Sequence, residues 1–201
     1  TTKVFPVLSR QLWQNQNSPP PLNMRYPCFW YAEHENESGK WIGPLTGLVD
    51  EGIAQDKDGD ITRFWLIEGD GARGKKLKCW ARHEPQIPMQ TECAVLLLDG
   101  GLWGKVVKPE SLHRPEYCAD LLGQQWNAEQ CWNYLLRSPL FYPKYRDMFW
   151  VVLFNERLLN SVEVPLEELQ RTAVRTESEP RHLRLAAGDV KEGRLRWFDL
   201  Y

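Results

Sequence analysis

Cationic side chains alternate with a tryptophan over residues 76–82, KLKCWAR. In an extended chain, successive side chains point to opposite faces. One face then carries three cations and an indole ring, at Lys76, Lys78, Trp80 and Arg82. Burying three cations without partners is costly, so we expect this face to be open to solvent or to an acidic ligand. Bases stack on aromatic rings while cations follow the phosphates, so the pattern favours single-stranded DNA or RNA as the ligand.

A neighbouring segment, residues 61–67, extends this candidate surface. Its alternation places Arg63 and Trp65 on one face and Phe64 and Leu66 on the other. Trp103 is a further ring on which a base could stack. The candidate nucleic-acid-binding residues are therefore Arg63, Trp65, Lys76, Lys78, Trp80, Arg82 and Trp103. The alternative is that Trp65 and Trp80 are structural and pack against residues 115–201.

The elements that would position these residues are five short strands between residues 43 and 113. The segments are rich in β-branched and aromatic residues and are bounded by Gly and Asp clusters, a pattern typical of strands; they cover residues 44–55, 61–69, 75–84, 92–101 and 102–112. Five strands with a long connection between the third and fourth resemble the general pattern of an OB-fold barrel. That resemblance implies a small closed barrel that binds single strands on the face of its second and third strands.

The pattern changes to helical spacing after Pro109. Residues 115–138 predict two short helices, the second capped by Asn127. Strands are expected at 147–154 and 158–164, a short helix from Pro165, and a hairpin near the C-terminus. The expected fold is α+β: an N-terminal segment and Pro-rich linker (1–24), an OB-like barrel (25–114), and an α+β segment packed on the barrel (115–201).

No metal or cofactor site is predicted. Asp56, Asp58 and Asp60 alternate as in a calcium loop, but the positions that need Gly and Glu hold Ile61 and Ile67. A hairpin turn is therefore the preferred interpretation. Residues 68–76, EGDGARGKK, have no phosphate-loop pattern. A zinc site at His113, Cys118 and Cys131 would lack the closely paired ligands of such sites.

Composition limits the classes of partner. The net charge of −2 argues against a histone-like polyanion binder, so a nucleic-acid site has to be a local patch. The five cysteines show no CxxC spacing and no signal peptide is recognised, so we expect reduced thiols and an intracellular protein. No apolar run approaches the ~20 residues of a membrane span.

Three functional classes remain open. The first is the nucleic-acid-binding OB-like module. The second is a protein–protein interaction subunit of a larger complex, built on an OB-like or Tudor-like barrel whose Trp-rich surface binds a partner. The third is an enzyme whose residues are scattered along the sequence. Because the chain has no HExxH pattern and no GxSxG turn, we expect a protein that is not an enzyme.

Overall fold

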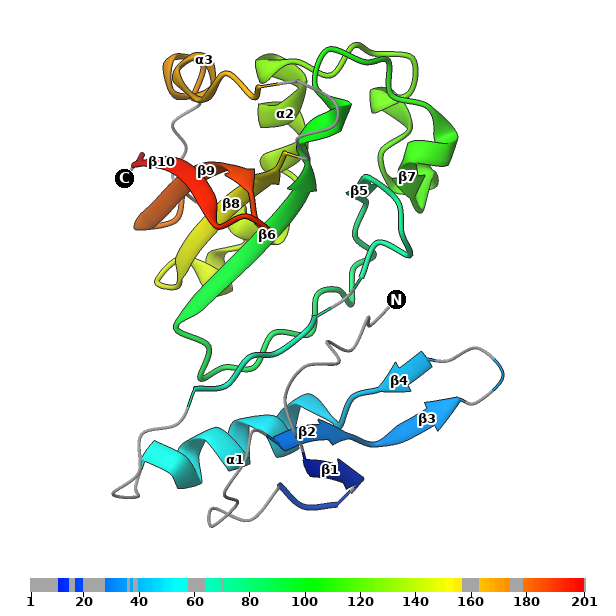
Figure 1. Ribbon diagram of the computed structural model, residues 1–201, viewed down its shortest axis with the longest axis vertical. Helices are drawn as coiled ribbons and strands as arrows, with labels where there is room; N and C mark the ends of the chain where they lie inside the picture. The colour runs from blue at the N-terminus through cyan, green and yellow to red at the C-terminus, as the bar shows by residue number, and fades with distance from the viewer. Residues whose placement is uncertain are drawn as a thin grey trace. The chain divides into compact units, whose positions relative to one another are not determined.

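The computed structural model describes residues 11–14, 17–19, 28–35, 37, 40–57, 64–69, 71–156, 163–173 and 179–200. Two compact units divide the chain. Unit 1 comprises residues 1–71 and 86–90, and unit 2 comprises residues 72–85 and 91–201. Each unit has its own strands and helices, labelled in Figure 1, and each is described by itself below.

Unit 1 combines two small sheets with one long helix. Strand β1 (Gln11–Gln14) pairs in parallel with β2 (Cys28–Tyr31), and β3 (Glu33–Glu35) pairs antiparallel with β4 (Lys40–Ile42). Helix α1 (Thr46–Lys57) follows. Its buried side chains are spaced three or four residues apart, the helical period, at Val49, Ile53 and Asp56.

The centre of unit 2 is a four-stranded sheet in the order β6-β8-β9-β10. Strands β6 (Cys93–Asp99), β8 (Phe149–Asn155) and β9 (His182–Asp189) are parallel, and β10 (Arg194–Asp199) is antiparallel to β9. Parallel neighbours need crossover connections. These contain α2 (Ala128–Leu135), between β6 and β8, and α3 (Leu166–Arg171), between β8 and β9.

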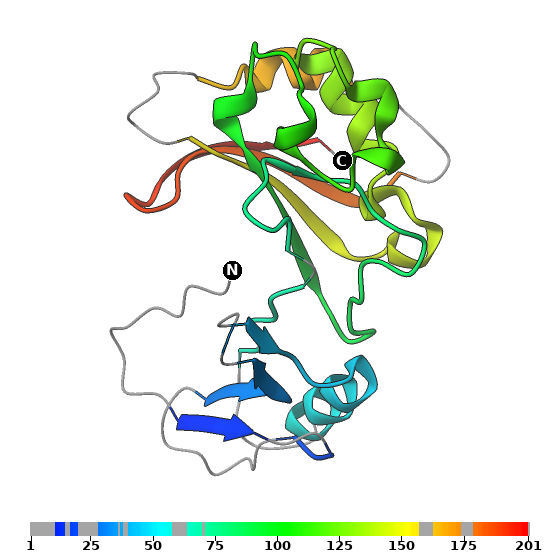
Figure 2. The ribbon, with the colours of Figure 1, turned by 90° about the vertical axis from the view of Figure 1, so that its right-hand side faces the viewer.

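Both crossover helices lie on the same side of this sheet, as Figures 1 and 2 show. They cover the face that carries the buried strand side chains, Trp150, Val152, Phe154, Leu183, Leu185 and Ala187. Trp132 on α2 joins the two helices, since its indole N–H donates to the carbonyl oxygen of Leu169 on α3 at 2.8 Å. The core of unit 2 therefore lies between the sheet and this helical layer.

The remaining elements of unit 2 are short. Strand β5 (Leu77–Lys78) pairs in parallel with β7 (Leu112–His113). Single 3-10 turns occupy Gly100–Leu102, Pro109–Ser111, Pro115–Tyr117, Ala119–Leu121, Pro139–Phe141 and Pro143–Tyr145. All six turns lie, together with α2, in the crossover between β6 and β8, which makes that crossover long.

The predicted five-stranded OB-like barrel is wrong. The described strands form one four-stranded and three two-stranded sheets, and none closes into a barrel. The first expected strand is helix α1, and the described residues of the second, 64–69, have no regular structure. The third shortens to β5, and the fifth becomes turns followed by β7. Only the fourth is a full strand, and it belongs to the parallel sheet as β6.

Several local predictions for the C-terminal half are confirmed. Asn127 caps α2 by accepting a hydrogen bond from the Gln130 N–H at 3.0 Å. Strand β8, helix α3 and the β9–β10 hairpin occur where they were expected. The first of the two short helices is replaced by 3-10 turns. The expected strand at 158–164 and the tip of the Asp56–Asp60 turn fall mainly outside the described residues.

A candidate basic site in unit 2

The segment between residues 72 and 84 enters unit 2 through a tight turn. The Lys75 N–H donates to the Ala72 carbonyl oxygen at 2.9 Å, with Arg73 and Gly74 between them in the left-handed region (φ 51° and 74°). Strand β5 follows and is held against β7, since the N–H groups of Lys76 and Cys79 donate to the carbonyl oxygens of Ser111 and His113. Five cations and no acid occur over residues 72–83.

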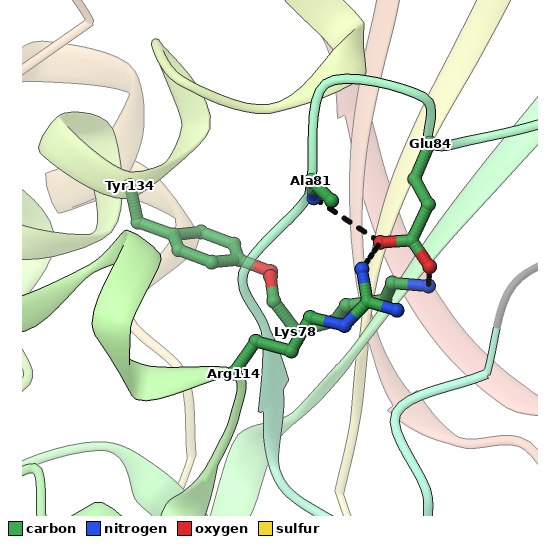
Figure 3. Close-up of polar contacts among 5 residues, drawn as sticks. All are labelled: Lys78, Ala81, Glu84, Arg114 and Tyr134. Carbon is green, nitrogen blue, oxygen red and sulfur yellow. Dashed lines mark hydrogen bonds and ion pairs between the residues drawn. The ribbon is translucent and has the colours of Figure 1, made fainter.

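Glu84 is the buried carboxylate that organises this segment (Figure 3). Its Oε1 accepts from Lys78 Nζ at 3.0 Å. Its Oε2 accepts from the Ala81 N–H at 3.2 Å and from Arg114 Nη1 at 2.6 Å. Burial alone would raise the pKa of Glu84, but the Ala81 N–H and the two cations outweigh it and hold the pKa below its usual range. Glu84 is therefore ionised, and it links the loop at residues 78–84 to Arg114, the residue that follows β7.

Two arginines of this region adopt backbone conformations that are rare for residues with a side chain. Arg73 has φ 51° and Arg114 has φ 63°, and they are the only residues other than glycine with positive φ in the described part of the chain. Such conformations cost about 1–3 kcal/mol and concentrate at binding and catalytic sites. Both arginines belong to the same region of unit 2, which marks it as a candidate site.

His113 lies among these cations. Partial burial lowers the pKa of its imidazole, and the positive charges of Arg114, Arg73 and Lys78 lower it further, against an opposing effect of Glu84. The side chain is therefore neutral at pH 7 and can both donate and accept a hydrogen bond. The six residues Arg73, Lys75, Lys76, Arg82, His113 and Arg114 are named here the basic cluster.

The basic cluster is weakly neutralised. Arg114 is paired with Glu84, and Lys76 Nζ lies 3.7 Å from Asp99 Oδ2. Within the described part of the chain, no carboxylate forms an ion pair with Arg73, Lys75 or Arg82, all of which are exposed. The cluster is therefore locally positive in a chain whose net charge is −2.

The structure separates the sequence-predicted binding residues into three places. Lys76, Lys78, Trp80 and Arg82 all belong to unit 2, but they do not share an open face, because Lys78 is buried with Glu84. Trp80 is half-buried, and its ring centroid is 5.2 Å from that of Tyr134. Arg82 is exposed. The expectation that Lys78 is solvent-accessible is therefore wrong, and the reason is that β5 is covered on both sides.

The other three predicted residues lie elsewhere. Trp65 belongs to unit 1, where its indole N–H donates to Asp56 Oδ2 at 2.6 Å. Trp103 follows β6 and packs edge-on against Phe154, with ring centroids 6.2 Å apart. Arg63 lies outside the described residues.

Sequence reasoning missed the roles of Glu84 and Arg114. One signal was available for Glu84, because it is the first acid after a twelve-residue stretch that holds five cations. Buried cations require a partner, and Glu84 follows Lys78 by only six positions. For Arg114 no local signal exists, since its contact with Glu84 spans 30 residues of sequence.

Unit 2 also contains a pair of buried thiols. Cys79 and Cys118 are both buried, and the interaction between the two thiols together with burial raises the pKa of Cys79. None of the five cysteines, all within the described residues, forms a disulfide. No group of three or more His, Cys, Asp or Glu side chains in the described ranges is placed to hold a metal ion. His113, Cys118 and Cys131 are accordingly not brought together as zinc ligands.

Unit 2 is thus a mixed α and β unit built on a largely parallel sheet, with a cation-rich loop region beside it. The chain belongs to the YqeC protein family, whose model matches residues 1–116 and so includes the whole basic cluster. It is 41% identical over 84 residues to "Uncharacterized protein YqeC" of Escherichia coli (strain K12). That match covers 40% of this chain and 32%, about a third, of the relative's length. No solved structure matches the chain.

No helix among the described residues has the length and apolar character needed to cross a membrane.

Proposed function

We propose that unit 2 binds a phosphate-bearing polyanion, single-stranded nucleic acid, through the basic cluster. The observation that carries the proposal is the pair of strained arginines, Arg73 and Arg114, whose positive charges both act on the neutral His113. A positive-φ arginine persists only where the surrounding structure holds it. Guanidinium groups match phosphate oxygens in geometry and charge, so the strain at Arg73 supports the positioning of a phosphate-binding group. Arg114 is held by Glu84 at 2.6 Å and has further N–H donors for such a contact.

The extent of the cluster favours a polymer over a single small anion. Its cations begin at Arg73 and continue to Arg82, across the β5 segment. A half-buried ring, Trp80, lies in the sequence between Lys76 and Arg82. One side of that ring packs against Tyr134, and its exposed part offers a stacking surface for a base, an interaction worth ~1–3 kcal/mol.

The test is fluorescence anisotropy with a labelled oligothymidylate of about 15 nucleotides, at about 50 and about 200 mM salt. We expect binding that weakens steeply as salt rises, because each phosphate contact releases a counterion. The double variant Arg73→Gln/Arg82→Gln should weaken binding and reduce the slope of log K against log salt by about 1.4, which is about 0.7 for each lost contact.

Lys191→Gln is the matched control. Lys191 is an exposed cation on the turn between β9 and β10, outside the basic cluster. The control should leave both affinity and salt slope unchanged, whereas a purely non-specific attraction would respond equally to any lost charge. Absence of binding at about 50 mM salt, or the same loss per removed charge in the control and in the double variant, would reject the proposal.

A protein-interaction role is favoured by a different observation, the apolar side chains exposed on the sheet of unit 2. This second candidate is developed in the next subsection and does not depend on nucleic-acid binding.

A further inference from the structure

The face of the four-stranded sheet opposite α2 and α3 is apolar and exposed. Strand side chains alternate between faces, and the register aligns this face in rows across the strands, including Val95–Val151–Arg184–Asp199 and Leu97–Leu153–Ala186–Trp197. We name it the open face. Its most exposed apolar side chains lie on the two outer strands: Val95 (57%), Leu97 (58%), Leu195 (41%) and Trp197 (58%).

An uncovered face is unusual for this kind of sheet. Parallel strands are joined by helical crossovers, so largely parallel sheets normally have both faces covered. Here the face beneath α2 and α3 is buried, while both Val151 and Leu153 on the central strand β8 remain partly exposed on the other side. A contiguous exposed apolar surface of this kind marks an interaction site.

The charges on the open face do not select a charged partner. Arg184 and Asp199 form a two-point ion pair, with distances of 2.7 Å from Nε to Oδ1 and 3.1 Å from Nη2 to Oδ2. The Arg184 guanidinium also lies 5.9 Å from the centre of the Trp197 ring. Asp99, which ends β6 on the same face by alternation, is paired with Lys76 at 3.7 Å. Because each of these charges has a partner, a second neutral apolar surface can cover the Arg184–Asp199 pair without an unpaired ion.

We propose that the open face binds the open face of a second copy of this chain. A two-fold axis parallel to the strands would place β6 of one copy over β10 of the other, and β8 over β9. The side chains are complementary in that arrangement. Leu97 would meet Trp197, and Leu153 on β8 would lie over the smaller Ala186 on β9. In the next row, Val95 and Val151 would cover the Arg184–Asp199 ion pair of the other copy. Two-fold contacts of this type require a patch that fits itself, and two sheet faces pack in this way in sandwiches.

The size of the face predicts a weak dimer. Four strands about 4.8 Å apart and seven residues long form a flat face of roughly 450 Å² per copy. Two such faces give roughly 900 Å² in total, a figure that omits the additional surface area of the protruding side chains. Stable interfaces bury about 1,200–2,000 Å². A dissociation constant on the order of 10 µM is therefore expected, with monomer and dimer exchanging readily.

The test is sedimentation velocity of the full chain, without nucleic acid, from about 1 to about 200 µM. The wild type should shift from monomer to dimer across this range. Leu97→Asp should raise the dissociation constant more than about tenfold, because it buries an unpaired carboxylate against the Trp197 ring of the other copy. The double variant Leu97→Asp/Trp197→Lys should regain association, since opposite charges then face each other across the two-fold axis.

Val106→Asp is the matched control, because Val106 is an apolar side chain of unit 2 with similar exposure (50%) and is not part of the open face. It should dimerise like the wild type, and circular dichroism should show that all variants keep the wild-type melting transition. A chain that remains monomeric at about 200 µM overturns the proposal and leaves the face to a different polypeptide. Association that Leu97→Asp does not change overturns it as well, because the contact then lies elsewhere.

Discussion

The Tyr134 hydroxyl donates a hydrogen bond to the backbone carbonyl oxygen of Lys78 at 2.9 Å, across 56 residues of sequence. Tyr134 lies on α2 and is buried, and burial raises its pKa well above the usual value, so the hydroxyl keeps its proton. Its ring also contacts those of Trp80 and Trp126. Through Tyr134, helix α2 holds strand β5, which lies within the cation-rich segment at residues 72–83.

Replacing Tyr134 by phenylalanine should destabilise unit 2 with little change in packing. Tyr134→Phe removes the hydroxyl and leaves the Lys78 carbonyl oxygen without this donor in a buried position. The expected loss is about 1–2 kcal/mol in the free energy of unfolding, measured by urea denaturation. Tyr117→Phe, at an exposed position, should change the same quantity by less than about 0.5 kcal/mol. Equal effects of the two substitutions would argue against a structural role for the Tyr134 hydrogen bond.

Glu84→Gln should be considerably more costly. It removes the carboxylate charge that pairs with the buried ammonium group of Lys78 at 3.0 Å. Breaking a buried ion pair from one side typically costs about 3–5 kcal/mol, so we expect a loss near the lower end of that range at pH 7. Glu192→Gln, at an exposed position on the turn between β9 and β10, is the control for loss of one carboxylate.

The same residue gives a defined pH dependence. The pKa of Glu84 is lowered in the folded protein, so its stabilising contribution is complete above its unfolded pKa of about 4.3. That contribution is lost as the pH falls through the lower folded value. The difference in unfolding free energy between wild type and Glu84→Gln should therefore be constant from about pH 6 to 7 and shrink below about pH 4. A difference that persists unchanged in acid would show that the charge of Glu84 is not what stabilises the loop.

Gly188→Ala should disrupt the β9–β10 hairpin. Gly188 has φ +150°, and a Cβ atom added there would lie 2.0 Å from the carbonyl oxygen of Arg194. Backbone atoms of a paired strand cannot move aside, so the expected loss exceeds about 3 kcal/mol. Gly193→Ala is the informative comparison, since its φ is +65° but its added Cβ meets nothing within 4 Å. Backbone strain alone should cost it about 1–2 kcal/mol. Thermal melting of both variants would separate the clash from the strain.

The thiols should react in a fixed order. Cys93 is exposed, whereas Cys79, Cys118 and Cys131 are buried. In dilute solution, where the proposed dimer is dissociated, Ellman's reagent should modify Cys93 early and the three buried thiols only on unfolding. Partial burial raises the pKa of Cys93, with a smaller opposing effect of Arg184, so this reaction should still accelerate above about pH 8.5. Rapid modification of Cys79 or Cys131 in the native protein would contradict the packing described here.

Local signals predicted the C-terminal half of the chain well. Asn127, the apolar stripe of α2 and the buried run of β8 each act through neighbours a few residues away, and such patterns are readable from one sequence. Helix α1 was missed because Gly47 and Gly52 weaken its propensity. Its buried apolar side chains, Val49 and Ile53, are too few to outweigh the β-branched character of the segment.

The sequence predicted cations of the candidate site but not how the fold arranges them. The cations of residues 73–82 are correctly placed in one segment, but alternation cannot reveal that a second layer covers Lys78. Lys78 is buried because the Tyr134 hydroxyl on α2 binds its backbone carbonyl oxygen, and because the chain turns after Ala81 and brings the Glu84 carboxylate back to this segment. Arg114 joins the site through a parallel pairing of β5 with β7 that links residues 35 positions apart. Contacts of this range follow from the tertiary fold, which the period of a single segment does not encode.

The path of the chain between the two units restricts how the protein can be divided. Residues 72–85 belong to unit 2, residues 86–90 to unit 1, and the chain then returns to unit 2 at residue 91. A recombinant fragment that begins at β6 would therefore lack β5, leave β7 without its pairing strand and remove Glu84 from Arg114. Neither unit can be excised by a single cut. Grafting the sheet of unit 2 onto another protein would require residues 72–201 as one piece. Residues 86–90, which belong to unit 1, would have to remain in that piece as a loop.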